Sequence, residues 1–175
     1  MSRERTKAAL HRVIFTAQAQ SKPLGVIRLN KIVFCADVEA FDKRLEYITE
    51  GQYIKRPRGP VVDGFYFLID EMKDEGLISE AIKETDAYDI REYTSLTEPD
   101  MSLFLPEEIE LLDRFTMEIC NEPAKAAKDK THNHVWDIGE MDAPLPVAGY
   151  FKTEVLPFTD VDVEKISELL TVHSE

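Results

Sequence analysis

Hydrophobic residues recur at helical spacing along much of the chain. The first such stretch covers residues 6–19, and the second, residues 26–41, is apolar on two faces. Because a helix that is apolar on two faces is usually packed on both sides, the second stretch is predicted to lie at the centre of the fold. Two further helices are predicted over residues 60–75 and from residue 106 onward, since proline suits the first position of a helix.

A different period, with apolar and polar residues alternating, predicts a β-hairpin over about residues 77–96. Ile78, Glu80 and Ile82 alternate strictly, residues 85–87 suit a turn, and the alternation restarts at Tyr88. Later segments are predicted as a small polar helix or linker, an irregular stretch and a final helix (residues 121–131, 132–150 and 162–172). The expected class is therefore mainly α: a single domain over residues 1–175 with about five to six helices and one small antiparallel hairpin.

Composition places the chain among ordinary globular proteins. It has 175 residues, of which 43% are hydrophobic and 31% charged. No apolar run approaches the ~20 residues that span a bilayer, and the N-terminal segment lacks the apolar core of a secretory signal. Cys35 and Cys120 fall within apolar helical patterns and are interpreted as reduced, buried thiols. We therefore expect a cytoplasmic protein without a membrane partner.

Charge is divided unevenly along the chain. Residues 1–60 carry 12 basic and 6 acidic side chains, whereas residues 61–175 carry 9 and 28, for a net charge of −13. The simplest interpretation is a solvated surface on which the two parts mix in the folded protein. The functional interpretation is a dipolar protein that presents one sign to a partner. Nucleic acid is a disfavoured partner because the net charge repels a polyanion.

Familiar catalytic motifs are missing from the sequence, which contains no GxGxxG, P-loop, GxSxG or HExxH pattern. His132 and His134, with Asp137 nearby, have ligand chemistry, since two histidines on one side of an extended segment can share a zinc ion. The spacing fixes no third ligand, so we interpret this segment as a loop and expect no metal and no cofactor. A small metal-dependent enzyme at His132/His134 is the less favoured alternative.

Two further features suit contact with a partner. Tyr53, Arg56 and Arg58 form an aromatic and basic segment of the kind that stacks on bases or contacts phosphates, although these arginines equally suit ion pairs with the many acids of this chain. Trp136, the single tryptophan, is interpreted as a plug that pins the irregular stretch to the core; exposed, it would be a binding hot spot.

The order and spacing of several short motifs resemble a known family. Residues 29–39 (LNKIVFCADVE) contain a leucine, a lysine, apolar residues and an alanine–aspartate pair. Two further matching segments are GQYI (residues 51–54) and RGPV (58–61). EPD (98–100) and LF (103–104) then precede the acidic helix start, and TH (131–132) and VW (135–136) follow it. Over about residues 5–150 this arrangement is similar to the SocA-like antitoxin family, or Panacea domain, whose members often occur in phage and prophage regions. The acidic residue that usually precedes the tryptophan is absent here, and the segment after Tyr150 has no counterpart.

The resemblance implies a mostly α-helical domain that binds a partner and is not an enzyme. Members of the family neutralise a toxin encoded beside them, by direct contact or as adaptors that deliver it to a protease. The expected partners are thus a cognate toxin and, for an adaptor, a cellular AAA+ protease; the oligomeric state is left open. The candidate partner-binding residues are Asp37, Tyr53, Arg56, Arg58 and Trp136.

Two further motif residues, Gly59 and Pro60, are assigned to backbone geometry. A nucleic-acid-binding regulator that uses the basic first third of the chain is the main alternative function.

Overall fold

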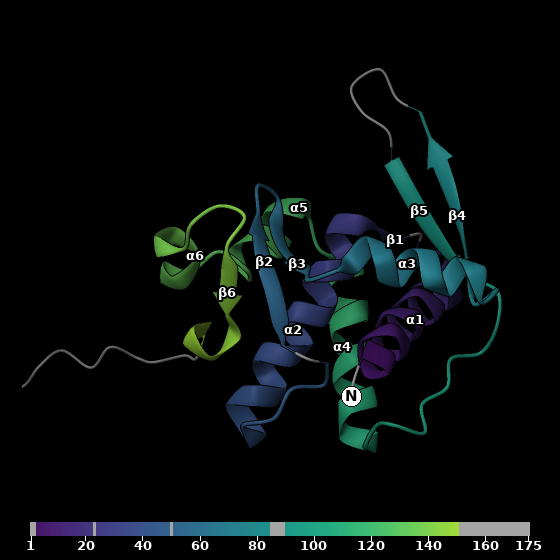
Figure 1. The fold of residues 1–175 in the computed structure, drawn as a ribbon, viewed down its shortest axis with the longest axis horizontal. Coiled ribbons are helices and arrows are strands. Elements are labelled where there is room, and N and C mark those ends of the chain that lie inside the picture. Colours follow the sequence, from purple (N-terminus) through teal and green to yellow (C-terminus); the bar gives the residue numbers. More distant parts are fainter. Residues whose placement is uncertain (1–2, 23, 50, 85–89, 151–175) are drawn as a thin grey trace, which may run out of the picture.

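The structure is a computed structural model that describes residues 3–22, 24–49, 51–84 and 90–150 (Figure 1). The helices of this part are α1 (Arg3–Ala19), α2 (Val26–Arg44), α3 (Phe65–Asp74), α4 (Pro106–Asn121), α5 (Ala124–Asp129), α6 (His134–Ile138) and the 3-10 helix η1 (Val147–Tyr150). The strands are β1 (Leu24–Gly25), β2 (Gln52–Arg56), β3 (Gly59–Val62), β4 (Ile78–Lys83), β5 (Ile90–Ser95) and β6 (Pro144–Pro146). The helix predicted over residues 162–172 and the turn predicted over residues 85–87 lie outside the described residues.

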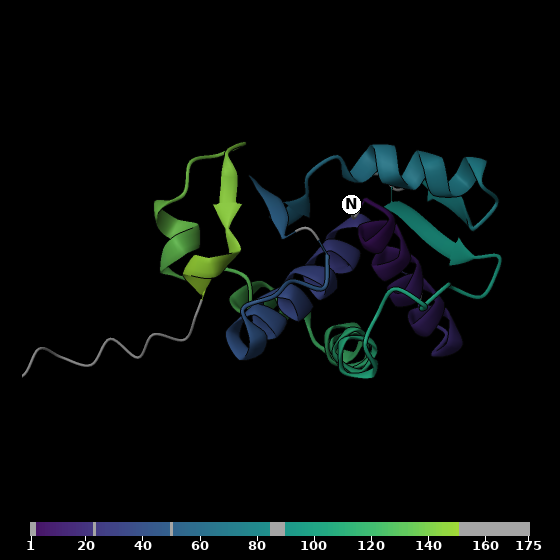
Figure 2. The same ribbon diagram turned by 60° about the horizontal axis from the view of Figure 1, so that its bottom comes forward.

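Helix α2 occupies the centre of the molecule, as its two apolar faces predict. It contacts α1, α4, β3 and η1, and Figures 1 and 2 show it between the β4–β5 hairpin on one side and β6 and α6 on the other. Leu45 caps the end of the helix in a left-handed conformation (φ 59°), and its N–H donates to the Phe41 carbonyl. Lys43 and Arg44 in the last turn suit the negative end of the helix dipole.

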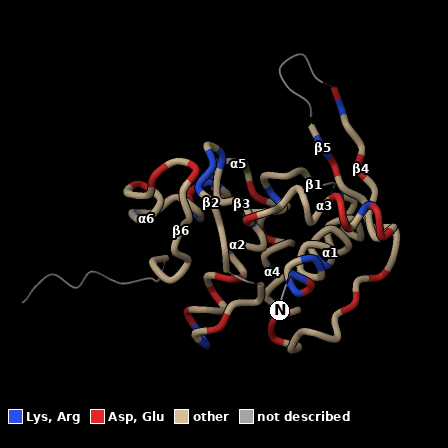
Figure 3. The backbone as a smooth tube through the Cα atoms, in the orientation of Figure 1, with Lys and Arg blue, Asp and Glu red and all other residues tan. Residues whose placement is uncertain are grey.

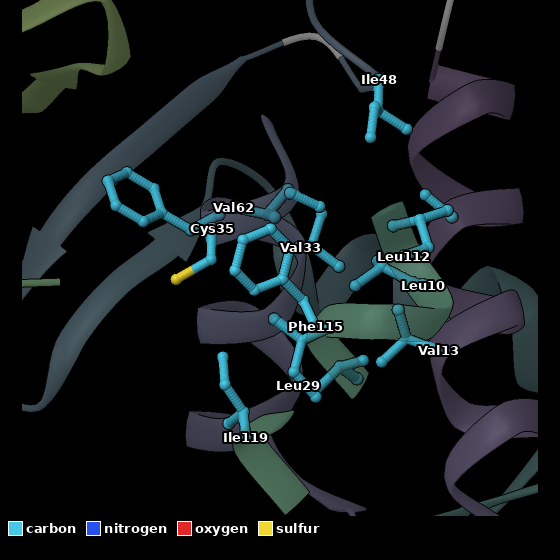
Figure 4. Packing of buried hydrophobic residues seen from close by; sticks show 14 of the residues in the cluster. Leu10, Val13, Leu29, Val33, Cys35, Ile48, Val62, Leu112, Phe115 and Ile119 are labelled. Carbon is cyan, nitrogen blue, oxygen red and sulfur yellow. The ribbon is translucent and has the colours of Figure 1, made fainter. Parts of the chain in front are cut away.

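The hydrophobic core lies where α1, α2 and α4 meet. Figure 4 shows the side chains that fill this junction: Leu10, Val13, Leu29, Val33, Leu112 and Phe115. Burying one such side chain fully contributes about 1.5–3 kcal/mol, so this junction is a main source of stability. The helical spacing of these residues in the sequence is what brings them to one face of each helix.

The strands form two small antiparallel sheets, ordered β1-β5-β4 and β3-β2-β6. The predicted hairpin is confirmed as β4 and β5, with Ile78 opposite Ser95 and Lys83 opposite Ile90. The second sheet was not expected from the sequence. With six α-helices and two three-stranded sheets among the described residues, the class is mixed α/β, and the mainly α class with a single hairpin is corrected.

The helix predicted over residues 60–75 begins later than expected. Residues 59–62 form strand β3, and α3 starts at Phe65 after Gly64, which has a φ of 71°. Pro60 lies opposite Lys55 in an edge strand, where its missing N–H is tolerated. Part of the stretch predicted as irregular is ordered as α6, β6 and η1. None of the described helices has both the length and the apolar character needed to cross a membrane.

Candidate functional site

Asp37 is the centre of a buried hydrogen-bonded group, the Asp37 cluster, which comprises Asp37, Ile48, Thr49 and Tyr53. The Asp37 side chain has no exposed surface. Its Oδ1 accepts hydrogen bonds from the backbone N–H of Ile48 at 2.7 Å and of Thr49 at 2.9 Å. Its Oδ2 accepts from the hydroxyls of Thr49 and Tyr53, the latter at 2.6 Å. The carboxylate therefore ties the turn after α2 and strand β2 to the central helix.

Burial governs the ionisation of this cluster. Desolvation raises the pKa of Asp37, and the hydrogen bonds from Thr49, Tyr53 and Ile48 oppose that rise without cancelling it. Desolvation and the adjacent Asp37 raise the pKa of Tyr53 well above its ordinary value. Neither side chain reaches the surface, since Tyr53 is 2% exposed. Asp37 and Tyr53 therefore hold the turn after α2 and strand β2 in place from the interior. Their predicted contact with a partner stays a prediction.

A second group, which we call the Lys31 cluster, comprises Lys31, Lys55, Lys128, His132 and Trp136. The three lysines act electrostatically on His132, whose ring is in contact with Trp136. Lys31 on α2 is 4% exposed and forms no hydrogen bond or ion pair with any residue that the structure describes. Gly59 of β3 lies against it, because a Cβ at Gly59 would stand 3.0 Å from Lys31 Cε. Gly59 also has a φ of 137°, which explains why a glycine occupies this motif position.

His132 and Trp136 are in direct contact within the Lys31 cluster. Their rings are stacked, with centroids 4.0 Å apart and planes 15° from parallel. Trp136 is 7% exposed, which agrees with its interpretation as a plug. Lys55 Nζ lies 4.9 Å from the centre of the Trp136 ring and donates to the carbonyls of Trp136 (2.6 Å) and Gly139 (3.0 Å). The His132 Nε2 atom is buried without a hydrogen-bond partner among the described residues.

The local sequence explains how His132 and Trp136 are held. Asn133 caps α6, and its side-chain oxygen accepts from the N–H groups of Val135 (3.0 Å) and Trp136 (3.2 Å). Desolvation lowers the pKa of His132, and the positive charges of Lys31, Lys128 and Lys55 lower it further against an opposing effect of Asp137. His132 therefore lies in a positively charged surrounding.

An exposed aromatic pair lies beside the β2–β3 hairpin, at the start of α3. Phe67 is 72% exposed and Tyr66 55% exposed. Phe67 lines two adjoining grooves of about 440 and 670 Å³, which share a wall from Val62 to Gly64. Arg56 and Arg58 line the larger groove. We call Arg56, Arg58, Tyr66 and Phe67 the aromatic surface.

The charge on this surface comes from the tip of the β2–β3 hairpin, where Figure 3 shows Lys and Arg gathered. Arg56 and Arg58 are both exposed, and Arg56 forms an ion pair with Asp142. The surface thus combines the two arginines of the predicted aromatic and basic segment with two aromatic side chains, Tyr66 and Phe67, that the sequence analysis did not single out. Tyr53 does not join it, because its ring is buried against Phe34 in an edge-to-face contact with centroids 5.0 Å apart.

Metal-dependent and thiol chemistry find little support in the described residues. No group of three or more His, Cys, Asp or Glu residues there could hold a metal ion. The His134 side chain lies outside what the structure describes, so its predicted pairing with His132 stays open. Cys35 and Cys120 are free and buried, as predicted, and burial raises the pKa of Cys35 to about 12. A thiol of this kind is a poor nucleophile at neutral pH.

Comparison with known proteins identifies the family. The model of the family described as "Antitoxin SocA-like, Panacea domain" matches residues 29–137. The chain belongs to this family, as the motif order indicated. No curated protein and no solved structure matches the chain significantly. The match spans both clusters and the aromatic surface, and it supports an antitoxin role in general.

Sequence reasoning missed Tyr66, Phe67 and the grooves beside them. A signal was present, because Phe65, Leu68 and Met72 form the buried stripe of α3, and Tyr66 and Phe67 fall outside it. Two large aromatic residues on the polar face of a short helix indicate a surface that favours contact. No comparable pattern predicted the Lys31 cluster, because Lys31, Lys55 and Trp136 are distant from one another in the sequence.

Proposed function

We propose that the protein is an antitoxin that neutralises a cognate toxin by direct contact through the aromatic surface. The observation that carries the proposal is the exposure of Tyr66 and Phe67 beside two adjoining grooves. Aromatic anchors of this kind dominate the binding free energy of many protein interfaces. Family membership supplies the class of partner, a toxin.

The arginines of the hairpin add selectivity to this contact. Arg56 and Arg58 line the larger groove, so a toxin segment with an apolar anchor and an acidic neighbour would fit there. Complementary charge speeds association and selects partners more than it adds affinity. Association should therefore slow as the salt concentration rises. Asp37, Tyr53 and Trp136 support the hairpin and its surroundings from inside, in one domain that acts in the cytoplasm.

A growth assay tests the proposal in cells. The protein encoded by the adjacent gene is expressed alone and then together with this chain. We expect toxicity alone, rescue by the wild-type chain and loss of rescue with Phe67→Ala. Ile82→Ala is the matched control, because Ile82 is also exposed (55%) but lies on the β4–β5 hairpin. Equal rescue by Phe67→Ala and Ile82→Ala would contradict the role of the aromatic surface.

The level of the toxin separates direct neutralisation from delivery to a protease. For direct contact, rescue occurs while the toxin level stays unchanged, in hosts with and without the AAA+ protease. A fall in toxin that requires the protease would assign the chain the adaptor mechanism instead. A neighbour that is harmless when expressed alone would contradict the antitoxin role for this pair.

A further inference from the structure

Strand β4 is the outer strand of the β1-β5-β4 sheet, so one of its edges faces no other described strand. Figure 1 shows the far end of the β4–β5 hairpin projecting away from the helices, with β4 on its outer side. The Leu96 N–H donates to the Leu77 carbonyl, which makes these residues a hydrogen-bonded pair at the start of the ladder. Bonded and non-bonded pairs alternate in an antiparallel ladder, so the N–H and C=O groups of Ile78, Glu80 and Ile82 point away from β5.

The outward backbone groups of β4 are available for pairing, because no hydrogen bond among the described residues reaches them. The β3-β2-β6 sheet offers no comparable edge. Pro60 in β3 lacks an N–H, and the N–H of Val62 donates to the side-chain oxygen of Asn30 at 2.8 Å. Strand β6 at the other edge begins with Pro144 and ends with Pro146. Among the described strands of four or more residues, β4 therefore has the outer edge most suited to accept another strand.

Charge protects the β4 edge only in part. Charged side chains on an edge strand usually prevent pairing between sheets. Glu80 lies in the middle of β4, but its carboxylate is already held by Lys73 and Arg91, each at 3.0 Å. Ile82 follows it along the edge and is 55% exposed. The middle of the edge therefore combines unused backbone groups with an exposed apolar side chain, and Lys83 stands only at its end.

We propose that β4 pairs antiparallel with β4 of a second copy of this chain, about a two-fold axis at Ala81. A symmetric pairing that overlaps most of the strand is centred on Glu80 or on Ala81. Centring on Glu80 places two carboxylates directly opposite each other, which is destabilising. Centring on Ala81 places Glu80 opposite Ile82 of the partner subunit, where their outward backbone groups bond each other.

The small side chain of Ala81 suits this axis. The two Ala81 residues would meet as a non-hydrogen-bonded pair, the position at which antiparallel strands approach most closely. The pairing joins the two hairpin sheets into one continuous sheet and covers the exposed Ile82 side chains. This interaction surface goes beyond the proposed function and does not depend on toxin binding.

The first test is amide hydrogen exchange of the full-length wild-type chain at a low and a high protein concentration. The N–H groups of Glu80 and Ile82 should exchange more slowly at the higher concentration, because pairing follows mass action. The N–H groups of Ala81 and Lys83 are internal controls, since they already face β5 and should be protected alike at both concentrations. Exchange at Glu80 and Ile82 that does not change with concentration would overturn the proposal.

Cysteine variants then test the register. In Ala81→Cys the two new thiols face each other across the axis, with the Cα atoms about 4.5 Å apart, which a disulfide can span. Mild oxidation should therefore give a covalent dimer of this variant. Thr94→Cys is the matched control, because Thr94 is exposed on the same face of the hairpin but lies on the inner strand β5. Equal cross-linking of the two variants, or none in Ala81→Cys, would contradict the pairing.

A proline variant separates backbone pairing from other modes of association. Ile82→Pro removes an outward N–H that the β4–β5 ladder does not use, and the dimer loses this hydrogen bond twice. The dimer affinity measured by sedimentation equilibrium should therefore fall about tenfold or more. Ile82→Val keeps the N–H and should leave the affinity unchanged; equal affinities of the two variants would contradict the proposal.

The exchange and cross-linking experiments decide the question even if Ile82→Pro does not fold. They also separate a second copy from a different occupant of the edge. If the wild-type chain stays monomeric, and Glu80 and Ile82 gain protection only when the toxin is added, the edge binds the toxin and pairing between copies is wrong.

Discussion

Asp37 and Lys31 lie six positions apart on the same helix, and both are buried charged residues, yet their surroundings are opposite. The two oxygens of Asp37 accept four hydrogen bonds from Ile48, Thr49 and Tyr53. The ammonium group of Lys31 has no hydrogen bond or ion pair with the described residues, and its Nζ keeps contact with solvent. The burial of a residue alone therefore does not reveal how its charge is satisfied, because Asp37 is satisfied by hydrogen bonds within the fold and Lys31 is satisfied by solvent.

The comparison also separates the interior from the surface that meets a partner. Asp37, Tyr53 and Trp136 are motif residues, and all three are buried. Tyr66 and Phe67, which carry the proposed contact, belong to no motif segment and are largely exposed. The motifs thus build the fold and the Lys31 cluster, while recognition is expected at residues outside them. The following variants test whether the buried motif residues serve stability rather than recognition.

The largest effect is expected for Asp37→Ala. The change leaves the N–H groups of Ile48 and Thr49 and the hydroxyl of Tyr53 buried without an acceptor, at about 1–3 kcal/mol for each group. The free energy of unfolding in urea should therefore fall by about 3 kcal/mol or more. Asp42→Ala removes an exposed carboxylate from the same helix and should change it by less than about 0.5 kcal/mol. If the free energy of unfolding fell by a similar amount in the two variants, the stabilising role of the Asp37 cluster would be contradicted.

Gly59→Ala should have the next largest effect. An alanine at a φ of 137° is strained, and its Cβ would stand 3.0 Å from Lys31 Cε. We expect the free energy of unfolding to fall by about 1–3 kcal/mol. Gly64→Ala is a matched control, since Gly64 also has a positive φ (71°), but a Cβ added there would meet no described atom within 4 Å. If Gly59→Ala lowered the free energy of unfolding no more than Gly64→Ala, the close contact with Lys31 would make no contribution to the loss.

The pH dependence of stability isolates the Asp37 carboxyl group. Because the folded-state pKa of Asp37 is raised above 3.8, the folded state binds this proton more tightly than the unfolded state. The contribution of Asp37 is therefore lost as the pH rises from 3.8 through the folded-state pKa. The difference in unfolding free energy between wild type and Asp37→Asn should shrink over this range. A difference that grows with pH would show that hydrogen bonding outweighs desolvation.

Lys31→Met should have the smallest effect, and in the opposite direction. Burial lowers the pKa of Lys31, so replacing it by an apolar side chain of similar length should leave stability unchanged or raise it by about 1 kcal/mol. Since the folded-state pKa of Lys31 is lowered from 10.5, the gain should fade as the pH approaches 10.5. A loss as large as that of Asp37→Ala would show that the two residues do not differ as described.

The sequence predicted the helices and the β4–β5 hairpin because both rest on local periodicity. It failed on the β3-β2-β6 sheet for two physical reasons. Pro60, Pro144 and Pro146 disfavour strands, and residues 52–54 pair with residues 144–146, far along the chain. Local patterns carry no information on such pairing.

The site was predictable in part. Arg56 and Arg58 were recognised as a basic segment, and the structure places them on an exposed hairpin. Lys31 and Asp37 both lie on a helix that is apolar on two faces, so the local pattern does not distinguish them. Which of the two would find partners depends on Thr49 and Tyr53 folding back onto α2, and periodicity cannot reveal that contact.

The most direct test of the central claim is a calorimetric titration of the purified cognate toxin with folded Phe67→Ala protein. We predict that the variant unfolds at the same temperature as the wild type, because Phe67 is 72% exposed. Its affinity for the toxin should fall about 30-fold or more, as expected for a hot-spot aromatic residue. An affinity equal to that of the wild type would contradict the claim that this antitoxin recognises its partner through the aromatic surface.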